Sequence, residues 1–303
     1  MFDVISFGSA VVDVFLDTDI AEKGKFMCYP VGSKILMKNL RFSIGGGGTN
    51  SSVAFSRFGF KTGYIGKIGD DNYGKEVIKM LKNEKIKFLG KMEKETVSGY
   101  SIVLDSKENN RTILTYKGIN NHLNFSELNL KKIKTKWLYL SSLLGDSFNS
   151  QKKLVKILNK KNTKIAFNPS DYLIKKNNLR DLLKYCKVLI LNKEEAMLLS
   201  NLNDSNKLLE NLYKLIKTNG IVVITNGNKK ISAYNGKNKF YLMPSKIKII
   251  EKTGAGDAFA SGFVSGQMLG KTIQDSLKLG LIESQSVIKH FGAKNKLLKR
   301  NLK

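Results

Sequence analysis

The stretch TGAGDAFASGFV, residues 253–264, joins a glycine-rich turn directly to an apolar helical run. Gly254 and Gly256 lack a Cβ atom, so the backbone N–H groups around them can approach a ligand closely. These groups lie at a predicted helix N-terminus, where the helix dipole favours an anion. Asp257 adds a negative charge there, which makes sense if it accepts a proton while a hydroxyl attacks a phosphoryl group. The alternative is a tight turn in which Asp257 only caps the helix.

A second glycine cluster, IGGGGTNSSVAFSRFG, occupies residues 44–59 and also leads into an apolar-periodic helix. Four successive glycines suit neither a helix nor a strand, and they are typical of a backbone that nearly touches a ligand. Asn50 offers both a donor and an acceptor, as a polyol or sugar requires. A flexible hinge with Asn50 as a helix cap is the alternative for this cluster.

Four further motifs accompany the two glycine clusters. They are DVISFGSAVVD at residues 3–13, GDDNYG at residues 69–74, NKEE at residues 192–195 and TNG at residues 225–227. All six stand in the order found in the ribokinase-like (PfkB-type) family of sugar and nucleoside kinases, which the chain resembles over nearly its whole length. The resemblance implies an ATP-dependent kinase that transfers the γ-phosphate to a hydroxyl group of a sugar.

The resemblance also implies a role for each motif. Asp257 is the expected catalytic base, and the backbone N–H groups of Gly254, Ala255 and Gly256 are expected to stabilise the developing charge. The remaining expected contacts are Asp13, Gly45, Gly46 and Asn50 with the acceptor, Asn192, Glu195, Thr225 and Gly227 with ATP, and Glu195 with Mg²⁺ through a water molecule. A nucleoside or a sugar phosphate remains an alternative acceptor, and a phosphate would need basic groups such as Arg111 and Lys117.

Two departures from the family pattern bear on function. The family usually has Asp two residues before Thr253, in a region that forms a monovalent-cation site in many members, but this chain has Glu251. Potassium activation is therefore left open. In ribokinase proper a Glu that touches the sugar follows the central strand, and the matching residues 137–144 contain no acid. This departure argues against ribose as the specific acceptor.

The rest of the sequence alternates predicted strands with predicted helices, which indicates an α/β, doubly wound parallel sheet with helices on both faces. The expected strands are Val4–Phe7, Thr62–Ile65, Trp137–Leu140, Thr163–Phe167, Val188–Leu191 and Ile221–Thr225, and the expected helices are Lys75–Asn83, Gln151–Asn159, Lys193–Leu199 and Lys207–Lys217. Residues 14–42 and 97–116 do not follow this alternation of strands and helices. They are expected to form a small β lid, with a hairpin turn at residues 106–110.

The lid is expected to cover the acceptor and exclude water, and in the resembling family such a lid can also form a dimer interface. The prediction is thus one kinase domain over residues 1–303, present as a monomer or as a homodimer through the lid. Residues 294–303 are expected to form a frayed basic tail.

The composition agrees with a soluble enzyme. The 303 residues are 42% hydrophobic and 25% charged, which is ordinary for a globular protein. No stretch approaches the ~20 apolar residues that span a bilayer, and the N-terminus has no signal-peptide pattern, so we expect a cytoplasmic protein without a membrane partner. Cys28 and Cys186 are too few and too far apart for a disulfide framework or a metal site.

The net charge of +27 raises a different class of function, a non-catalytic nucleic-acid binder. Nearly all of the basic residues are lysines spread along the chain, whereas specific phosphate and base contacts rely on arginine. The chain is also rich in Asn and Ile, as happens when coding DNA is rich in A and T. We therefore expect a solvated basic surface and no specific nucleic-acid partner.

Overall fold

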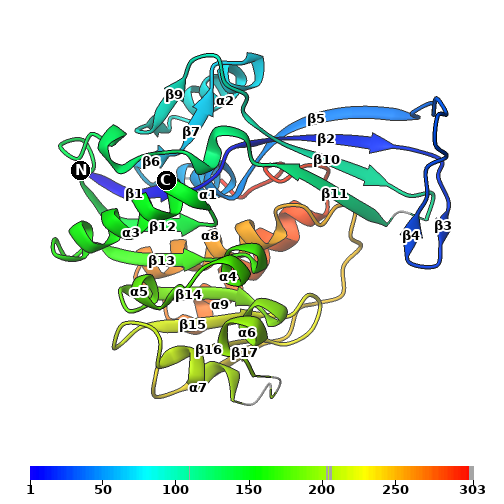
Figure 1. The fold of residues 1–303 in the computed structure, drawn as a ribbon. Coiled ribbons are helices and arrows are strands. Elements are labelled where there is room, and N and C mark those ends of the chain that lie inside the picture. The colour runs from blue at the N-terminus through cyan, green and yellow to red at the C-terminus, as the bar shows by residue number, and fades with distance from the viewer. Residues whose placement is uncertain (109, 203, 205–206, 300–303) are drawn as a thin grey trace.

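The computed structural model describes residues 1–108, 110–202, 204 and 207–299 (Figure 1). Its strands are β1 Phe2–Phe7, β2 Val11–Asp17, β3 Glu22–Lys23, β4 Phe26–Met27, β5 Asn39–Gly45, β6 Thr62–Ile65, β7 Lys67–Gly69, β8 Lys87–Phe88, β9 Lys91–Glu93, β10 Gly99–Asp105, β11 Arg111–Tyr116, β12 Thr135–Ser141, β13 Lys164–Asn168, β14 Cys186–Asn192, β15 Ile221–Thr225, β16 Ile231–Tyr234 and β17 Lys239–Leu242. Its α-helices are α1 Gly47–Arg57, α2 Asn72–Asn83, α3 Gly145–Asn159, α4 Asp171–Lys176, α5 Arg180–Leu183, α6 Lys193–Ser200, α7 Leu208–Tyr213, α8 Ala255–Met268 and α9 Ile273–Ile288.

The main sheet confirms the predicted fold class. Over the described residues its order is β17-β16-β15-β14-β13-β12-β1-β6-β8, and every pair from β15 to β8 is parallel. All six predicted strands lie in this parallel part. The antiparallel edge strands β16 and β17 were not predicted, because short half-buried strands at a sheet edge carry no long apolar run.

Both faces of the main sheet are buried, so its central strands are almost continuously apolar. On β12, Leu138 and Leu140 face a core shared with α3, α5 and α7, whereas Trp137 and Tyr139 face a core shared with α1, α8 and α9. The strand period of two residues thus divides one apolar run between two cores. Helices cover both faces of the sheet in Figure 1.

A second sheet, which we call the lid sheet, has the order β11-β10-β2-β5 among the described residues. Strand β2 pairs antiparallel with β5 and parallel with β10, and β10 forms an antiparallel hairpin with β11. This sheet extends away from the main sheet as an arm, with β3 and β4 at its tip (Figure 1). Residues 14–42 and 97–116 therefore supply most of it, although Asn109 of the predicted turn lies outside the described residues.

The motif at residues 3–13 does not end at the edge of the main sheet, because its last residue, Asp13, belongs to the lid sheet. Strand β2 begins at Val11, so Asp13 lies within the lid sheet, paired between Ser43 on β5 and Ser101 on β10. The chain leaves the main sheet at Gly8 and enters the lid sheet three residues later. Asp13 is consequently carried by the lid sheet and not by the main sheet.

Two further expectations were wrong in detail. Helix α7 ends at Tyr213 and not at residue 217, because the chain continues in tight turns that bury Ile216 in the core. The C-terminal segment is not frayed up to residue 299: Leu297 packs in the core, and the Leu298 N–H donates to the buried Glu283 carboxylate at 2.9 Å. Residues 300–303 of the predicted tail lie outside the described residues.

Candidate active site

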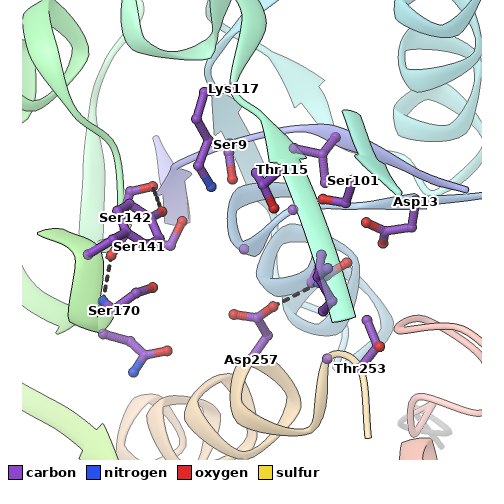
Figure 2. A pocket seen from close by; sticks show the side chains of 18 of the residues that line it. Ser9, Asp13, Ser101, Thr115, Lys117, Ser141, Ser142, Ser170, Thr253 and Asp257 are labelled. Atoms are coloured by element: carbon purple, nitrogen blue, oxygen red, sulfur yellow. Dashed lines mark hydrogen bonds between the residues drawn. The ribbon is translucent and has the colours of Figure 1, made fainter. Parts of the chain in front are cut away.

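The two glycine clusters, which are far apart in sequence, meet at the carboxyl edge of the main sheet. Asn50 on α1 donates from Nδ2 to Oδ2 of Asp257 on α8 at 2.7 Å, across 207 residues of sequence. Figure 2 shows Asp257 below the lid residues Thr115 and Ser101, with Asp13 and Thr253 to one side. This edge is where open α/β sheets bind their ligands.

The glycines are needed because two carboxylates lie against the backbone. A Cβ atom on Gly45 would lie 1.9 Å from Oδ2 of Asp13, and one on Gly47 would lie 3.2 Å from Oδ1 of Asp257. Gly46 has a φ of +94° and would also bring a Cβ within 2.6 Å of the Ser9 carbonyl oxygen. Because these glycines lack Cβ atoms, the carboxylates of Asp13 and Asp257 can both lie against the backbone of this cluster, beside the same ligand site.

Helix α8 places Asp257 in its first turn, beside amides that can receive an anion. Gly254, with a φ of +79°, is the N-cap, and no hydrogen bond joins the N–H of Gly254 or Gly256 to a described residue. The Ala255 N–H donates to the Lys252 carbonyl oxygen at 3.2 Å. Gly254 and Gly256 are thus better placed than Ala255 to stabilise developing negative charge.

A cavity of about 260 Å³ opens beside Asp257. Its floor comes from the ends of β1, β12 and β13 and from the two glycine clusters, and its roof is one face of the lid sheet. The lining residues used below are Ser9, Asp13, Gly46, Asn50, Ser101, Thr115, Lys117, Ser141, Ser142, Tyr172, Gly254 and Asp257. The cavity thus combines serine and threonine hydroxyls with two carboxylates.

Burial dominates the electrostatics of both carboxylates. Desolvation raises the pKa of Asp257, against the lowering effect of the Asn50 hydrogen bond and the Lys294 charge. Desolvation likewise raises the pKa of Asp13, while Lys294 and Ser101 oppose that rise. Carboxyl groups with raised pKa values in a cleft are typical of proton-transfer sites.

Lys294 is a site residue that sequence reasoning missed. Its Nζ donates to Oδ1 of Asn50 at 2.6 Å and also to the carbonyl oxygen of Ile44. Arg57 holds the Lys294 backbone by donating to its carbonyl oxygen at 2.7 Å, and Arg57 is itself paired with Glu84. Since lysine is common throughout this chain, nothing in the sequence distinguished this one.

The environment of Lys294 lowers the pKa of its ammonium group. Desolvation is the largest cause, and the neighbouring charges of Asp13 and Asp257 oppose it. Lys294 therefore donates to the amide oxygen of Asn50, and the amide nitrogen of Asn50 donates to Asp257. The result is a chain of contacts from a buried ammonium group, through an amide, to the candidate base.

The predicted nucleotide residues gather at the same sheet edge but do not line the cavity. Asn192 and Glu195 begin α6 with a capping box, in which Glu195 N donates to Asn192 Oδ1 and Asn192 N donates to Glu195 Oε2, each at 2.8 Å. Thr225 ends β15, the strand paired with β14, and Gly227 follows with a φ of +55° and open space around it. Asn192 thus caps α6, and one Glu195 oxygen remains outside the capping box.

Glu195 is the residue of this group that suits a cation. Desolvation raises the pKa of Glu195 to about 7, and the charges of Asp171, Glu194 and Asp257 add to that rise. A cation near Glu195 would relieve this repulsion. Within the described residues, no group of three or more His, Cys, Asp and Glu side chains is arranged to hold a metal ion.

Glu251 occupies the position where the sequence departs from the family pattern. Its carboxylate accepts from Arg111 of the lid sheet and, at 2.9 Å, from the Thr253 N–H. The Arg111 guanidinium also donates to Thr253 Oγ1 at 3.0 Å. This pairing ties the lid sheet to the turn before α8, and the Glu251 charge already has a cationic partner in the chain.

Comparison with known proteins gives a matching family model and several relatives. The family model described as pfkB family carbohydrate kinase matches residues 1–300. An uncharacterized sugar kinase of Archaeoglobus fulgidus is 26% identical over 252 residues, which cover 81% of this chain and 98% of the relative. The ribokinase of Schizosaccharomyces pombe is 26% identical and covers 97% of this chain and 94% of its own. A 5-dehydro-2-deoxygluconokinase of Clostridium perfringens is 27% identical and covers 92% of this chain and 85% of its own.

Solved structures share the fold over nearly the whole chain. Adenosine kinase from Sinorhizobium meliloti superposes with a TM-score of 0.84 at 19% identity and covers 98% of this chain and 97% of its own. A putative ribokinase II from E. coli, solved in complex with ATP and Mg²⁺, has a TM-score of 0.82 at 16% identity and covers 98% and 96%. At these identities the likeness concerns the fold. No helix among the described residues has the length and apolar character to cross a membrane.

Proposed function

Because the chain belongs to the pfkB family of carbohydrate kinases, we propose that Asp257 is the general base for phosphoryl transfer to a sugar hydroxyl group. The enzyme is an ATP-dependent kinase that transfers the γ-phosphate to an alcohol group. One observation carries the role of Asp257: Asn50 occupies Oδ2, and no described residue donates to Oδ1 beside the cavity. Oδ1 takes the hydroxyl proton as the acceptor oxygen attacks phosphorus.

The acceptor lies in the cavity between the lid sheet and the glycine clusters. Asp13 and Asn50 bind its hydroxyl groups, and Gly45 and Gly46 allow the sugar ring to approach the backbone. Serine and threonine hydroxyls dominate the rest of the lining, and Tyr172 is its one aromatic residue among the described residues. This lining favours a polyol over a nucleobase, which usually stacks on aromatic rings. A nucleoside acceptor, as in the adenosine kinase neighbour, is the second candidate.

ATP binds beside the acceptor, along the ends of β14 and β15. The proposed ATP site is formed by Asn192, Glu195, Thr225 and Gly227. The amides of Gly254 and Gly256 lie between the two substrates at the N-terminus of α8. When bound near Glu195, Mg²⁺ would neutralise phosphate charge, with water and phosphate oxygens as its main ligands. The proposed site contains no potassium ion, because Arg111 already neutralises the charge of Glu251.

An acceptor screen tests the proposed function. The purified protein is incubated with ATP and Mg²⁺ and with neutral sugars, sugar acids, sugar phosphates or nucleosides, and ADP release is measured. We expect acceptor-dependent ADP release with at least one sugar. Release that no acceptor stimulates would contradict the proposal, and stimulation by nucleosides alone would establish the second candidate.

Lys294→Met is expected to lower kcat/KM by ~10- to 100-fold, because a charge-assisted hydrogen bond to Asn50 is lost next to the base. The pH dependence is the sharper readout. The wild-type ammonium loses its proton as the pH rises past its lowered pKa of about 8, so activity should fall there. In Lys294→Met this alkaline decline should be absent. The acidic limb should shift upward, because Lys294 no longer lowers the pKa of Asp257.

Lys299→Met is a matched control, since Lys299 is exposed in the same C-terminal segment. The charges facing Lys294 are Asp13, Asp257, Arg57 and Glu84, and all of them remain in both variants. A pH–rate profile that keeps its alkaline decline in Lys294→Met would assign that limb to another group.

We propose that the lid sheet also joins two copies of the chain. Its inner face lines the cavity, whereas its outer face exposes large apolar side chains at Leu40, Phe42, Ile102, Leu114 and Tyr116. The register places these residues on one face, because Leu114 pairs with Ile102, Ile102 with Val14, and Val14 with Phe42. An exposed apolar patch of this kind is typical of a protein–protein interface.

The expected result for the lid is a homodimer that Leu114→Asp converts to a monomer. Light scattering coupled to size-exclusion chromatography measures this change, with Leu198→Asp on α6 as a control at another exposed leucine. A wild-type protein that is monomeric at micromolar concentration would contradict the dimer proposal.

The basic surface receives no separate function in this proposal. The free thiols of Cys28 and Cys186 are consistent with the reducing cytoplasm in which we place the enzyme. Binding to nucleic acid is expected to be weak, indifferent to sequence and steeply reduced by salt.

A further inference from the structure

Lys117 is a cation in the acceptor cavity that the proposed mechanism does not use. It follows β11 at the end of the lid sheet, and its Nζ lies 4.4 Å from the centre of the Tyr172 ring. Its ammonium forms no ion pair or hydrogen bond with a described residue. In Figure 2 the side chain enters the cavity on the side of Ser9 and Ser141, whereas Asp13 and Thr253 lie on the other side.

The partial burial of the Lys117 ammonium is not offset by a neighbouring anionic partner among the described residues. Desolvation lowers the pKa of Lys117, and the more distant Asp13 charge offsets only part of that effect. Buried charges in proteins are normally paired or hydrogen-bonded, since an unpaired charge loses its hydration without compensation. An aromatic ring face compensates a cation only in part.

The neighbouring lining residues suit an anionic oxygen. The Ser141 hydroxyl is buried, lines the cavity and has no hydrogen-bond partner among the described residues. Ser142 is the first residue after β12, and its Oγ accepts from the Ser170 N–H at 2.6 Å, which leaves the hydroxyl hydrogen available as a donor. No carboxylate follows β12 through residue 144, and Asp171, which precedes Tyr172, is paired with Lys175 at 2.9 Å.

From this arrangement we propose that the acceptor is a sugar acid, whose carboxylate is bound by Lys117 and the Ser141 hydroxyl while its reacting hydroxyl points to Asp257. The proposal rests on the sugar kinase activity proposed above and specifies the acceptor of that same site. A carboxylate is favoured over a phosphate for a physical reason. A phosphate monoester carries nearly two charges, but Arg111, the other basic residue of this lid hairpin near the cavity, is already paired with Glu251.

The test compares acceptors that differ in charge. ADP release is measured with gluconate and 2-keto-3-deoxygluconate as acids, fructose and ribose as neutral sugars, and fructose 6-phosphate as a phosphate. We expect the highest kcat/KM with an acid. In Lys117→Met the KM for that acid should rise by ~10- to 100-fold with little change in kcat, because the lost interaction binds the substrate and does not take part in proton transfer.

Two variants separate recognition from a structural role. Lys117→Arg keeps the charge and should recover at least part of the affinity for the acid. Lys230→Met is the matched control, since Lys230 also lies over a tyrosine ring, Tyr241 at 4.5 Å, but is exposed and outside the cavity. Thermal unfolding is recorded for each variant, so that a loss of stability is not mistaken for a loss of binding.

The outcomes distinguish this inference from the proposed function. If neutral sugars are phosphorylated well and acids are not, or if fructose 6-phosphate is preferred, the kinase assignment stands and the sugar-acid proposal is wrong. An unchanged KM for the acid in a folded Lys117→Met variant would also overturn it. If no acceptor of any class stimulates ADP release, both proposals fail together.

Discussion

Asp257→Asn is expected to lower kcat by ~10²- to 10⁴-fold while ATP affinity and the fold stay nearly unchanged. The amide cannot accept a proton from the acceptor hydroxyl, whereas its size still fits between Asn50 and Gly47. Steady-state ADP release measures kcat, and isothermal titration calorimetry measures ATP affinity on the same preparation.

The pH profile of the wild-type enzyme provides a second check on Asp257. Only the ionised carboxylate can act as a base, and desolvation raises its pKa above the ordinary 3.8 of an aspartate. Activity should therefore increase with pH through that raised pKa, so the acidic limb should lie above pH 3.8. In Asp257→Asn the remaining activity should lack this limb.

Asp275→Asn is a close control for Asp257→Asn. Both aspartates occupy the third residue of a helix, Asp257 in α8 and Asp275 in α9, but Asp275 is bound to its own N-cap Thr272 and lies outside the cavity. A general effect of charge at a helix start would appear in both variants. Near wild-type turnover of Asp257→Asn on the preferred acceptor would show that the assigned base is wrong.

Asp13→Ala is expected to lower kcat/KM for the acceptor by ~10- to 10⁴-fold, which corresponds to the loss of one or two charge-assisted hydrogen bonds. Asp13 lines the cavity from the lid sheet, next to Ser101. ATP affinity should stay almost constant, because a carboxylate repels phosphate and is not expected to bind it.

The control for Asp13→Ala lies on the same strand. Asp17 is four residues further along β2 on the same face of the lid sheet, where it accepts from Asn39 at 3.0 Å, and it does not line the cavity. Asp17→Ala should leave acceptor kinetics unchanged. Should ATP binding collapse in Asp13→Ala while acceptor kinetics are spared, the two substrates would be placed the wrong way round.

The amino-acid pattern alone was sufficient for the central parallel strands of the main sheet. Central strands such as β12 and β15 are buried on both faces, so their apolar runs are long enough to be recognised without tertiary information. The motif around Asp257 and the one around Asn50 could also be found, because glycines ahead of an apolar helix allow close backbone approach to a ligand. The edge strands β16 and β17 could not be found, since their pattern is short and half-buried.

The composition of the acceptor cavity depends on tertiary structure. Lys294 and Lys117 look like any other lysine of a lysine-rich chain, and Ser141 looks like an ordinary residue after a strand. Lys294 becomes a site residue because Arg57 and the packing of Leu297 hold its segment against Asn50. Lys117 becomes a site residue because the lid sheet, which it follows, folds over the edge of the main sheet.

Local sequence thus determined which backbone segments approach a ligand, because glycine content and apolar periodicity act within a few residues. Only the tertiary structure decided which charges meet there. The pKa of a carboxyl or ammonium group depends on how deeply it is buried and on charges that the fold brings near it. Asp13 shows this, because it interacts with Asp257 and Lys294, each more than two hundred residues away in the sequence. Such proximity is a property of chain packing that no short segment encodes.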